Sequence, residues 1–258
     1  MDFESVPVIF YRVKERSLAE IIEEPDYRKN IDWDRPLHVT LHLNLSADSQ
    51  VSGMFKIASF GTAGEPLFGN GTSDICIKQI FTTKTREIPN GKGQMVQVQQ
   101  KVAVDKQAQV RGLMTEVNCL SWSKGMLKMT YQFIDQALAA LGNMDLPFEI
   151  PRMRFVNAGL AWEQREGRNC IFLVEELISK EKEGIFRKYL HNGSAFPCYF
   201  GDNDDGNRAE FLAFSQHVQY WKTGKLVFVT DYQGRWLKFI TVSSMLTRAV
   251  ARGRFLVI

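Results

Sequence analysis

The chain has 258 residues, of which 45% are hydrophobic, 12% aromatic and 24% charged. This profile is typical of a globular protein and excludes a low-complexity or disordered chain. A formal net charge of +3 is too small to indicate a nucleic-acid partner. No apolar run approaches the roughly 18 residues that a membrane-spanning helix needs, so no membrane association is expected. The N-terminal residues have no basic region before their short apolar stretch, and no signal peptide is predicted.

The cysteines indicate a reducing compartment. Cys76, Cys119, Cys170 and Cys198 lie far apart in the chain. No CxxC pair is present, which excludes a zinc knuckle. A chain with a core of this size has little need of a disulfide framework, so the cytoplasm or the nucleus is the expected location.

The first residues are charged and of mixed character. We expect residues 1–35 to form a lead-in segment, with a short helix over 17–24 that ends before Pro25. The fold is expected to start near Pro36.

Strand patterns follow. Leucine and valine alternate with polar residues over 37–45, which predicts a half-buried strand. Residues 54–60 predict its hairpin partner, and residues 75–80 predict a third strand. Residues 83–100 are rich in Gln, Asn, Gly and Lys and are expected to form a long mobile loop.

Helical spacing appears over 110–120 and again over 126–141, where Gly142 would end the second pattern. Residues 155–162 and 170–177 then predict two strands joined by a turn. Strands, then helices, then strands indicate an α+β fold rather than alternating βαβ units.

The C-terminal third gives weaker signals. After a short apolar stretch at 185–190 comes a polar segment. A helix is predicted near 210–221 and a strand over 226–230.

Lys78 lies in the middle of the third predicted strand. One interpretation is a strand lysine that faces solvent. The other is a lysine that holds nucleotide phosphates, as strand lysines do in kinases. That role needs a carboxylate partner, and Glu116 is a candidate because it borders the apolar face of the predicted helix.

Asp231 and Gln233 follow the buried strand pattern of residues 226–229. A carboxylate just past such a strand, with an amide two residues on, is a common catalytic arrangement, although an ordinary turn fits as well. Gly53 lies in a hairpin turn whose backbone N–H groups could cover phosphates. The chain has neither GxGxxG nor GxxxxGK[ST], so a plain turn is the alternative. His217, in a helical pattern, is either a core residue or a ligand.

Several segments together resemble one family. FLVEELI at 172–178, FRKYLHNG at 186–193, EFLAFSQHVQY at 210–220 and LVFVTDYQG at 226–234 are similar to the alpha-type (atypical) Ser/Thr protein kinases. SGMFKIASFG, CIKQ, TEVNCL, YQFID and PRMRFV precede them in the family's order. That family includes the myosin heavy chain kinases, the elongation-factor kinase and the kinase domains fused to certain TRP channels. The resemblance spans residues 36–234.

The resemblance implies an ATP site in the first half of the chain. The loop from Gly53 to Lys56 would cover the triphosphate, with Lys56 where the family usually has Arg. Lys78 would contact the phosphates, and Glu116 would be its ion-pair partner. Glu175, in the stretch that joins the lobes, would lie at the adenine.

It also implies a catalytic and metal site in the second half. Asp231 would be the catalytic residue beside the substrate hydroxyl, and Gln233 would help to hold Mg²⁺. His217 would be one ligand of the family's structural zinc.

The C-terminal residues depart from the family pattern. From Tyr232 to Ile258 the chain has no Asp, Glu, His or Cys. The family's second Mg²⁺-binding Asp and three of its four zinc ligands are therefore missing, and we expect the zinc to be lost. Residues 235–258 are interpreted as a divergent tail.

The sequence thus predicts a two-lobed, kinase-like α+β fold. An N-lobe over about 36–170 is expected to be mainly antiparallel sheet plus helix, and a C-lobe over about 171–234 to be mixed and truncated. The expected function is ATP- and Mg²⁺-dependent phosphoryl transfer to serine or threonine of a protein substrate. The alternative is a catalytically impaired pseudokinase that acts as a nucleotide-binding or scaffold module.

Overall fold

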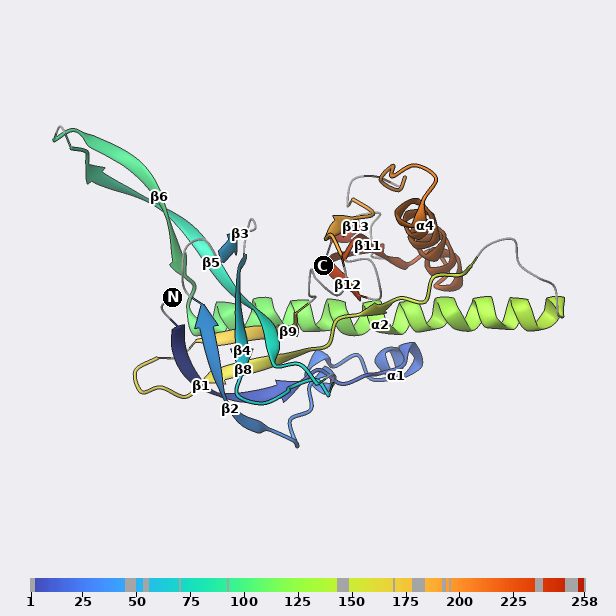
Figure 1. Ribbon diagram of the computed structural model, residues 1–258, viewed down its shortest axis with the longest axis horizontal. Coiled ribbons are helices and arrows are strands. Elements are labelled where there is room, and N and C mark those ends of the chain that lie inside the picture. The colour runs from blue at the N-terminus through green and yellow to red at the C-terminus, as the bar shows by residue number, and fades with distance from the viewer. Residues whose placement is uncertain are drawn as a thin grey trace. The chain divides into compact units, whose positions relative to one another are not determined.

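The computed structural model describes residues 3–44, 50–52, 56–69, 71–91, 93–142, 149–168, 170–177, 184–191, 194, 196–234, 239–248 and 255–257 (Figure 1). The chain divides into two compact units. The first unit consists of Met1–Arg12, Asp32–Met114 and Asn157–Leu177, and the second of Val13–Ile31, Thr115–Val156 and Ile178–Ile258. Among the described helices, none is both long and apolar enough to cross a membrane.

An antiparallel sheet of eight strands forms the first unit (Figure 1). Its strands, in chain order, are β1 (Phe3–Arg12), β2 (Leu37–Asn44), β3 (Gln50–Ser52), β4 (Lys56–Ala63), β5 (Asp74–Pro89), β6 (Met95–Ala103), β8 (Ala158–Glu163) and β9 (Ile171–Glu176). Their order in the sheet is β3-β4-β2-β1-β8-β9-β5-β6, and β4 also pairs with β5. Six strands therefore close into a ring, which leaves few unpaired edges.

Apolar side chains from alternate strand positions fill the core of this unit. Leu41 and Val174 are fully buried, as are Val6 and Ala161 on the neighbouring strands. The alternation predicted over 37–45 is confirmed, because Val39, Leu41 and Leu43 of β2 all lie in this core. The hairpin-like pairing of β8 with β9 is confirmed as well.

The start of the fold differs from the expectation. Residues 3–12 are not a lead-in segment but strand β1, which lies between β2 and β8. Phe10 is fully buried in the core. The strand is hard to recognise because it contains Pro7, which cannot donate to a ladder. Pro7 lies just outside the stretch that pairs with β8, which begins at Val8.

A second correction concerns residues 83–100. They do not form a mobile loop: β5 and β6 pair continuously from Phe81 with Ala103 to Pro89 with Met95. Asn90 begins the turn, where its N–H donates to the carbonyl of Gln94 at 2.8 Å. Most side chains of this hairpin are exposed on both faces. The sequence therefore lacks the apolar alternation by which a half-buried strand is recognised.

One helix replaces the two helical patterns of the sequence. Helix α2 (Lys106–Leu141) runs through both of them without a break. Gly125 lies inside it, and a Cβ there would come within 3.3 Å of the Leu18 backbone nitrogen. A glycine at this position thus allows the chain at Leu18 to approach closely. Gly142 follows the helix with φ of +72°, the left-handed conformation that commonly ends helices.

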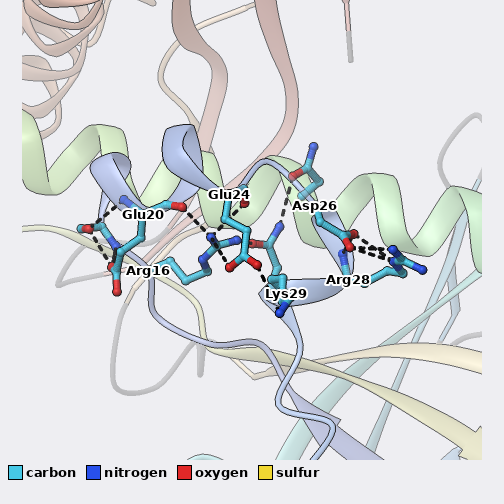
Figure 2. A network of polar contacts seen from close by, with 9 residues as sticks. Arg16, Glu20, Glu24, Asp26, Arg28 and Lys29 are labelled. Carbon is cyan, nitrogen blue, oxygen red and sulfur yellow. Dashed lines mark hydrogen bonds and ion pairs between the residues drawn. The ribbon is translucent and has the colours of Figure 1, made fainter.

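The second unit begins with helix α1 (Leu18–Glu23) and the 3₁₀ helix η1 (Tyr27–Asn30). The predicted helix over 17–24 is confirmed: Ser17 is its N-cap and forms a capping box with Glu20. Figure 2 shows the polar network around it. Arg16 donates to the carbonyl oxygens of Glu20 and Glu24, near the C-terminus of α1. The Glu24 carbonyl is an acceptor that the helix end leaves without an intrahelical partner, whereas the Glu20 carbonyl also accepts from the Glu24 N–H at 3.1 Å.

The same network reaches the 3₁₀ helix. Arg16 also donates to the side chain of the buried Asn30 at 3.0 Å, and Asn30 in turn donates to Asn118 of α2 at 3.1 Å. At the start of η1, the Arg28 guanidinium lowers the pKa of Asp26 to about 2 through side-chain hydrogen bonds (Figure 2). Because Arg28 is exposed and Asp26 is only partly buried, this pair orders the turn but adds little stability.

Ser17→Ala should lower the free energy of unfolding by about 1 kcal/mol, the usual effect of losing an N-cap side chain. The substitution removes the acceptor of the Glu20 N–H. Urea denaturation followed by circular dichroism measures the change. Ser17→Thr keeps a capping hydroxyl and should stay close to the wild type; equal losses in both variants would contradict this role for the hydroxyl.

The described residues of the second unit also form a smaller sheet and a further long helix. The sheet runs β10 (Arg187–Lys188), β11 (Val227–Gly234), β12 (Phe239–Arg248) and β13 (Phe255–Val257), and β7 (Arg154–Phe155) pairs in parallel with β12. Helix α4 (Asp204–Lys222) begins earlier than predicted, because Asn203 caps it and its acidic first turn suits a helix N-terminus. An α+β fold is confirmed.

Helix α4 is fixed to β11 by two glutamines. The Gln216 amide donates to the carbonyl of Val229 at 2.7 Å, and the Val229 N–H donates to Gln219 at 2.9 Å. Gln219 also donates to the hydroxyl of Tyr232 at 3.1 Å. All these groups are buried, and buried polar side chains with satisfied bonds specify one packing arrangement. The helix thereby holds β11, and with it Asp231, in a defined place.

Candidate functional site

Lys78 forms a partly buried ion pair in the first unit. It lies on β5, and its ammonium is 2.8 Å from one carboxylate oxygen of Glu175 and 2.7 Å from the other. Glu175 lies on the neighbouring strand β9, where Cys76 is its direct partner in the ladder. Lys78 and Glu175 are thus diagonal neighbours on one face of the sheet. The Lys78 side chain is 21% exposed and that of Glu175 is 10% exposed. Lys78 is therefore not a strand lysine that faces solvent, which is one of the two interpretations of its sequence position.

Cys76, beside this pair, is not a nucleophile at neutral pH. Burial, together with the nearby charge of Glu175, raises the pKa of its thiol to about 12. The reactive form of cysteine is the thiolate. Of these three side chains, the lysine ammonium and the Glu175 carboxylate are the ones that carry charge at neutral pH.

The other residues assigned to the ATP site are only partly placed. Gly53 lies outside the described residues. Lys56 is the first residue of β4 and is half-buried. It lies two positions before Ala58, which pairs with Lys78 across the ladder. Glu116 lies on α2 and belongs to the second unit, and its pairing with Lys78 remains a prediction.

Asp231 has an unusual backbone in the second unit. It lies within β11, yet its φ is +58°, the left-handed region that residues with a Cβ rarely adopt. In the ladder between β11 and β12, Thr230 pairs with Ser244 and Tyr232 pairs with Val242. Asp231, which lies between them, has no partner in this ladder. Strained residues of this kind persist only where the surroundings hold them, and they gather at functional sites.

The Asp231 side chain is buried against a cation. Its carboxylate is 5% exposed and forms an ion pair with the ammonium of Lys188 on β10. Among the described residues, no well-formed hydrogen bond reaches its Oδ1 atom. The positive charge of Lys188 is therefore what offsets the burial of this carboxylate.

Gln233 completes a group of three side chains. Lys188 on β10 is the direct partner of Gln233 across the ladder, and Gln233 is half-buried. The pairing of β10 with β11 thus brings a carboxylate, an ammonium and an amide together. Carboxylate and amide oxygens are hard ligands that fit Mg²⁺, which usually takes its remaining ligands from water and phosphate oxygens.

The local sequence around Lys188 gives no sign that it is a functional residue. The residues on either side of Lys188 both contact Asp205. Arg187 forms an ion pair with it at 2.6 Å, and the hydroxyl of the buried Tyr189 donates to the same carboxylate at 3.0 Å. Alternation along the strand leaves Lys188 directed to Asp231. A two-residue strand carries no periodic signal; the only sequence clue is its position inside the FRKYLHNG segment.

His217 lies exposed on α4. Among the described residues, no group of three or more His, Cys, Asp or Glu side chains is arranged to hold a metal ion. The described part of the chain therefore does not fit a structural zinc site, which needs four such ligands.

Elemental analysis of the purified chain should find no stoichiometric zinc, because the sequence after Tyr232 supplies no ligand to join His217. The same preparation should keep its unfolding midpoint after treatment with a strong chelator, since chelators denature proteins held by structural zinc. One zinc per chain, or a midpoint lowered by the chelator, would contradict this expectation.

Comparison of the whole fold defines the class of structure. The chain is similar to an alpha kinase from Entamoeba histolytica, with a TM-score of 0.54 and 12% identity over 97% of this chain and 81% of that one. It is also similar to the alpha-kinase domain of myosin-II heavy chain kinase A in complex with AMP-PNP, with a TM-score of 0.52 and 11% identity over 95% and 82% of the two chains. The chain therefore has an alpha-kinase-like fold.

A third structure gives the same result. The C-terminally truncated alpha-kinase domain of myosin heavy chain kinase matches with a TM-score of 0.52 and 11% identity, over 95% of this chain and 85% of that one. No protein-family model and no curated protein matches the sequence. At identities this low the likeness establishes the fold, and the function has to be argued from the site.

Proposed function

We propose that this chain is an ATP-dependent protein kinase of the alpha-kinase type, which transfers the γ-phosphoryl group to serine or threonine of a protein substrate. The observation that carries the proposal is the Asp231–Lys188–Gln233 group, with its strained and buried carboxylate. The alpha-kinase-like fold supports it, as does the partly buried Lys78–Glu175 pair.

Each side chain has a task that its charge suits. Phosphoryl transfer depends on positioning and on neutralising charge, because little covalent chemistry is left for the protein. Asp231 would accept the proton of the substrate hydroxyl, and Lys188 would neutralise charge on the transferred group. Mg²⁺, when bound, would supply further neutralisation of the phosphate oxygens, with Gln233 as its protein ligand.

Lys78 would hold the nucleotide phosphates, under the loop from Gly53 to Lys56. The resemblance assigns Glu116 as its partner and places Glu175 at the adenine. The two short contacts between Lys78 and Glu175 favour Glu175 as the residue that orients the ammonium. Glu116 then remains a second carboxylate proposed for the same lysine.

A catalytically impaired pseudokinase is the second candidate, and one observation favours it. The only carboxylate of the Asp231 group is already paired with Lys188, and no acidic residue follows Tyr232 in the sequence. Residues 232–258 therefore supply no anionic ligand for Mg²⁺. We accordingly propose a kinase of low turnover that still binds nucleotide.

Isothermal titration of the full chain with Mg·ATP tests the nucleotide site. Lys78→Ala should weaken binding by roughly tenfold or more, because it removes a charge-assisted contact to phosphate. Lys84→Ala is the matched control: Lys84 lies further along the same strand, is exposed, and should leave the affinity unchanged. Absence of binding at millimolar ATP, or equal affinity in all three proteins, would reject the proposed site.

A further inference from the structure

A cavity of about 470 Å³ lies within the second unit, and none of the residues that line it is assigned to catalysis. Residues of α2, of α4 and of the segment 149–151 line it. Its wall is mainly apolar, with Phe133 and Leu138 from α2 and Phe211 and Phe214 from α4. Phe214 is 44% exposed, which is a large apolar area to leave in water.

The cavity and β11 occupy different faces of α4. Phe211 and Gln216 are five residues apart, which is about 140° around a helix with 3.6 residues per turn. Gln216 bonds to β11, whereas Phe211 and Phe214 line the cavity. A molecule bound here would therefore not compete with a group at Asp231.

Size and lining suit a ligand with bulky apolar groups. Binding sites typically enclose 300–1,000 Å³, and a cavity of roughly 150 Å³ holds one benzene ring. The volume of about 470 Å³ thus has room for about two or three groups of that size. Two bulky side chains of a peptide match this space.

Charge selects the kind of ligand. Glu149 and Glu210 lie at the cavity, and both are exposed. Within the described part of the chain neither carboxylate has a cationic partner, and the neighbouring Arg152 is already paired with Asp135 at 2.6 Å. One ring of the aromatic wall already holds a cation of this chain, because Lys222 lies 4.9 Å from the centre of the Phe133 ring.

We propose that this cavity is a docking site for a basic, apolar segment of a partner protein. Two bulky apolar side chains of the segment enter the cavity, and lysine or arginine residues flanking them pair with Glu149 and Glu210. The site goes beyond the proposed kinase function, since it uses none of the residues assigned to nucleotide or catalysis.

Fluorescence anisotropy with the full chain and a labelled peptide, Arg-Gly-Phe-Leu-Gly-Arg, tests the proposal. This peptide should bind saturably. Glu-Gly-Phe-Leu-Gly-Glu and Arg-Gly-Ser-Ser-Gly-Arg should bind at least about tenfold more weakly, because each removes one of the two complementary features. No saturable binding of the first peptide, or equal binding of the acidic one, would overturn the proposal.

Variants of the chain locate the peptide. Phe214→Ala should weaken binding by about tenfold, and Glu149→Gln and Glu210→Gln by a few-fold each, the range for exposed ion pairs. Glu65→Gln removes an exposed carboxylate of the first unit and should have no effect. Binding that is unaffected by Phe214→Ala would place the peptide elsewhere and overturn the proposal.

Two further measurements distinguish this site from the nucleotide site and from a contact between two copies of the chain. Lys78→Ala, which acts on the nucleotide site, should leave peptide binding unchanged, so that failure of the kinase proposal and failure of the docking site are distinguishable. Sedimentation measures whether the wild type dimerises through the cavity. We expect no dimer that depends on Phe214, so the wild type and Phe214→Ala should sediment alike. A dimer of that kind would make a second copy of the chain the occupant and would overturn the proposal.

Discussion

Asp231→Ala should reduce the rate of phosphoryl transfer by at least about 10²–10³, the usual effect of removing one preorganised electrostatic group from an active site. The expected cause is loss of the carboxylate that lies against Lys188, two residues before Gln233 on the same strand. Initial rates with labelled ATP, Mg²⁺ and a basic protein substrate measure it. Low wild-type turnover requires long time courses and a background measured without enzyme.

Asp202→Ala is the matched control for this substitution. Asp202 is an exposed aspartate in the loop before α4 and should leave the rate unchanged. A wild-type rate typical of active kinases would contradict the low turnover we propose. A weak rate that Asp231→Ala leaves unchanged would remove Asp231 from the catalytic site.

Phe10→Ala should lower the free energy of unfolding by about 3–5 kcal/mol, as truncation of a fully buried phenylalanine generally does. Phe10 is 0% exposed and packs in the core of the first unit with side chains of several strands. The loss combines the transfer free energy of the ring with the cavity that remains. Urea denaturation of the full chain, with the midpoint and slope fitted together, gives the value.

Phe196→Ala provides the comparison at an exposed position. Phe196 is 80% exposed, so its replacement should change the free energy of unfolding by less than about 0.5 kcal/mol. A Phe10→Ala protein as stable as Phe196→Ala would mean that strand β1 does not belong to the core.

The strands that could be predicted from the sequence are those with one buried face. β2 shows this best, because its leucines and valine alternate with polar residues and point into the core. β1 lacks that signal, since apolar residues occupy both of its faces and Pro7 lies among them. The β5–β6 hairpin lacks it for the opposite reason, as both faces are largely exposed. Such strands are specified by their neighbours in the sheet, which a local pattern does not contain.

The candidate site shows the same division between local and long-range information. Lys78 and Asp231 could be singled out because each interrupts or follows an apolar strand. Their partners could not be found from local pattern, since Glu175 lies 97 residues from Lys78 in the chain. Lys188 reaches Asp231 only because a two-residue strand pairs with β11. The left-handed backbone of Asp231 likewise has no signal in the local pattern, because aspartate is compatible with both this conformation and an ordinary strand.

A kinase of this type must pass the γ-phosphoryl group of ATP to a hydroxyl of a protein. Phosphoamino-acid analysis of a protein substrate, after incubation with γ-labelled ATP and Mg²⁺, detects that transfer itself. We predict label on phosphoserine or phosphothreonine that depends on Mg²⁺ and is absent with Asp231→Ala. Saturable ATP binding without any labelled serine or threonine would contradict the kinase assignment and leave the nucleotide-binding pseudokinase in its place.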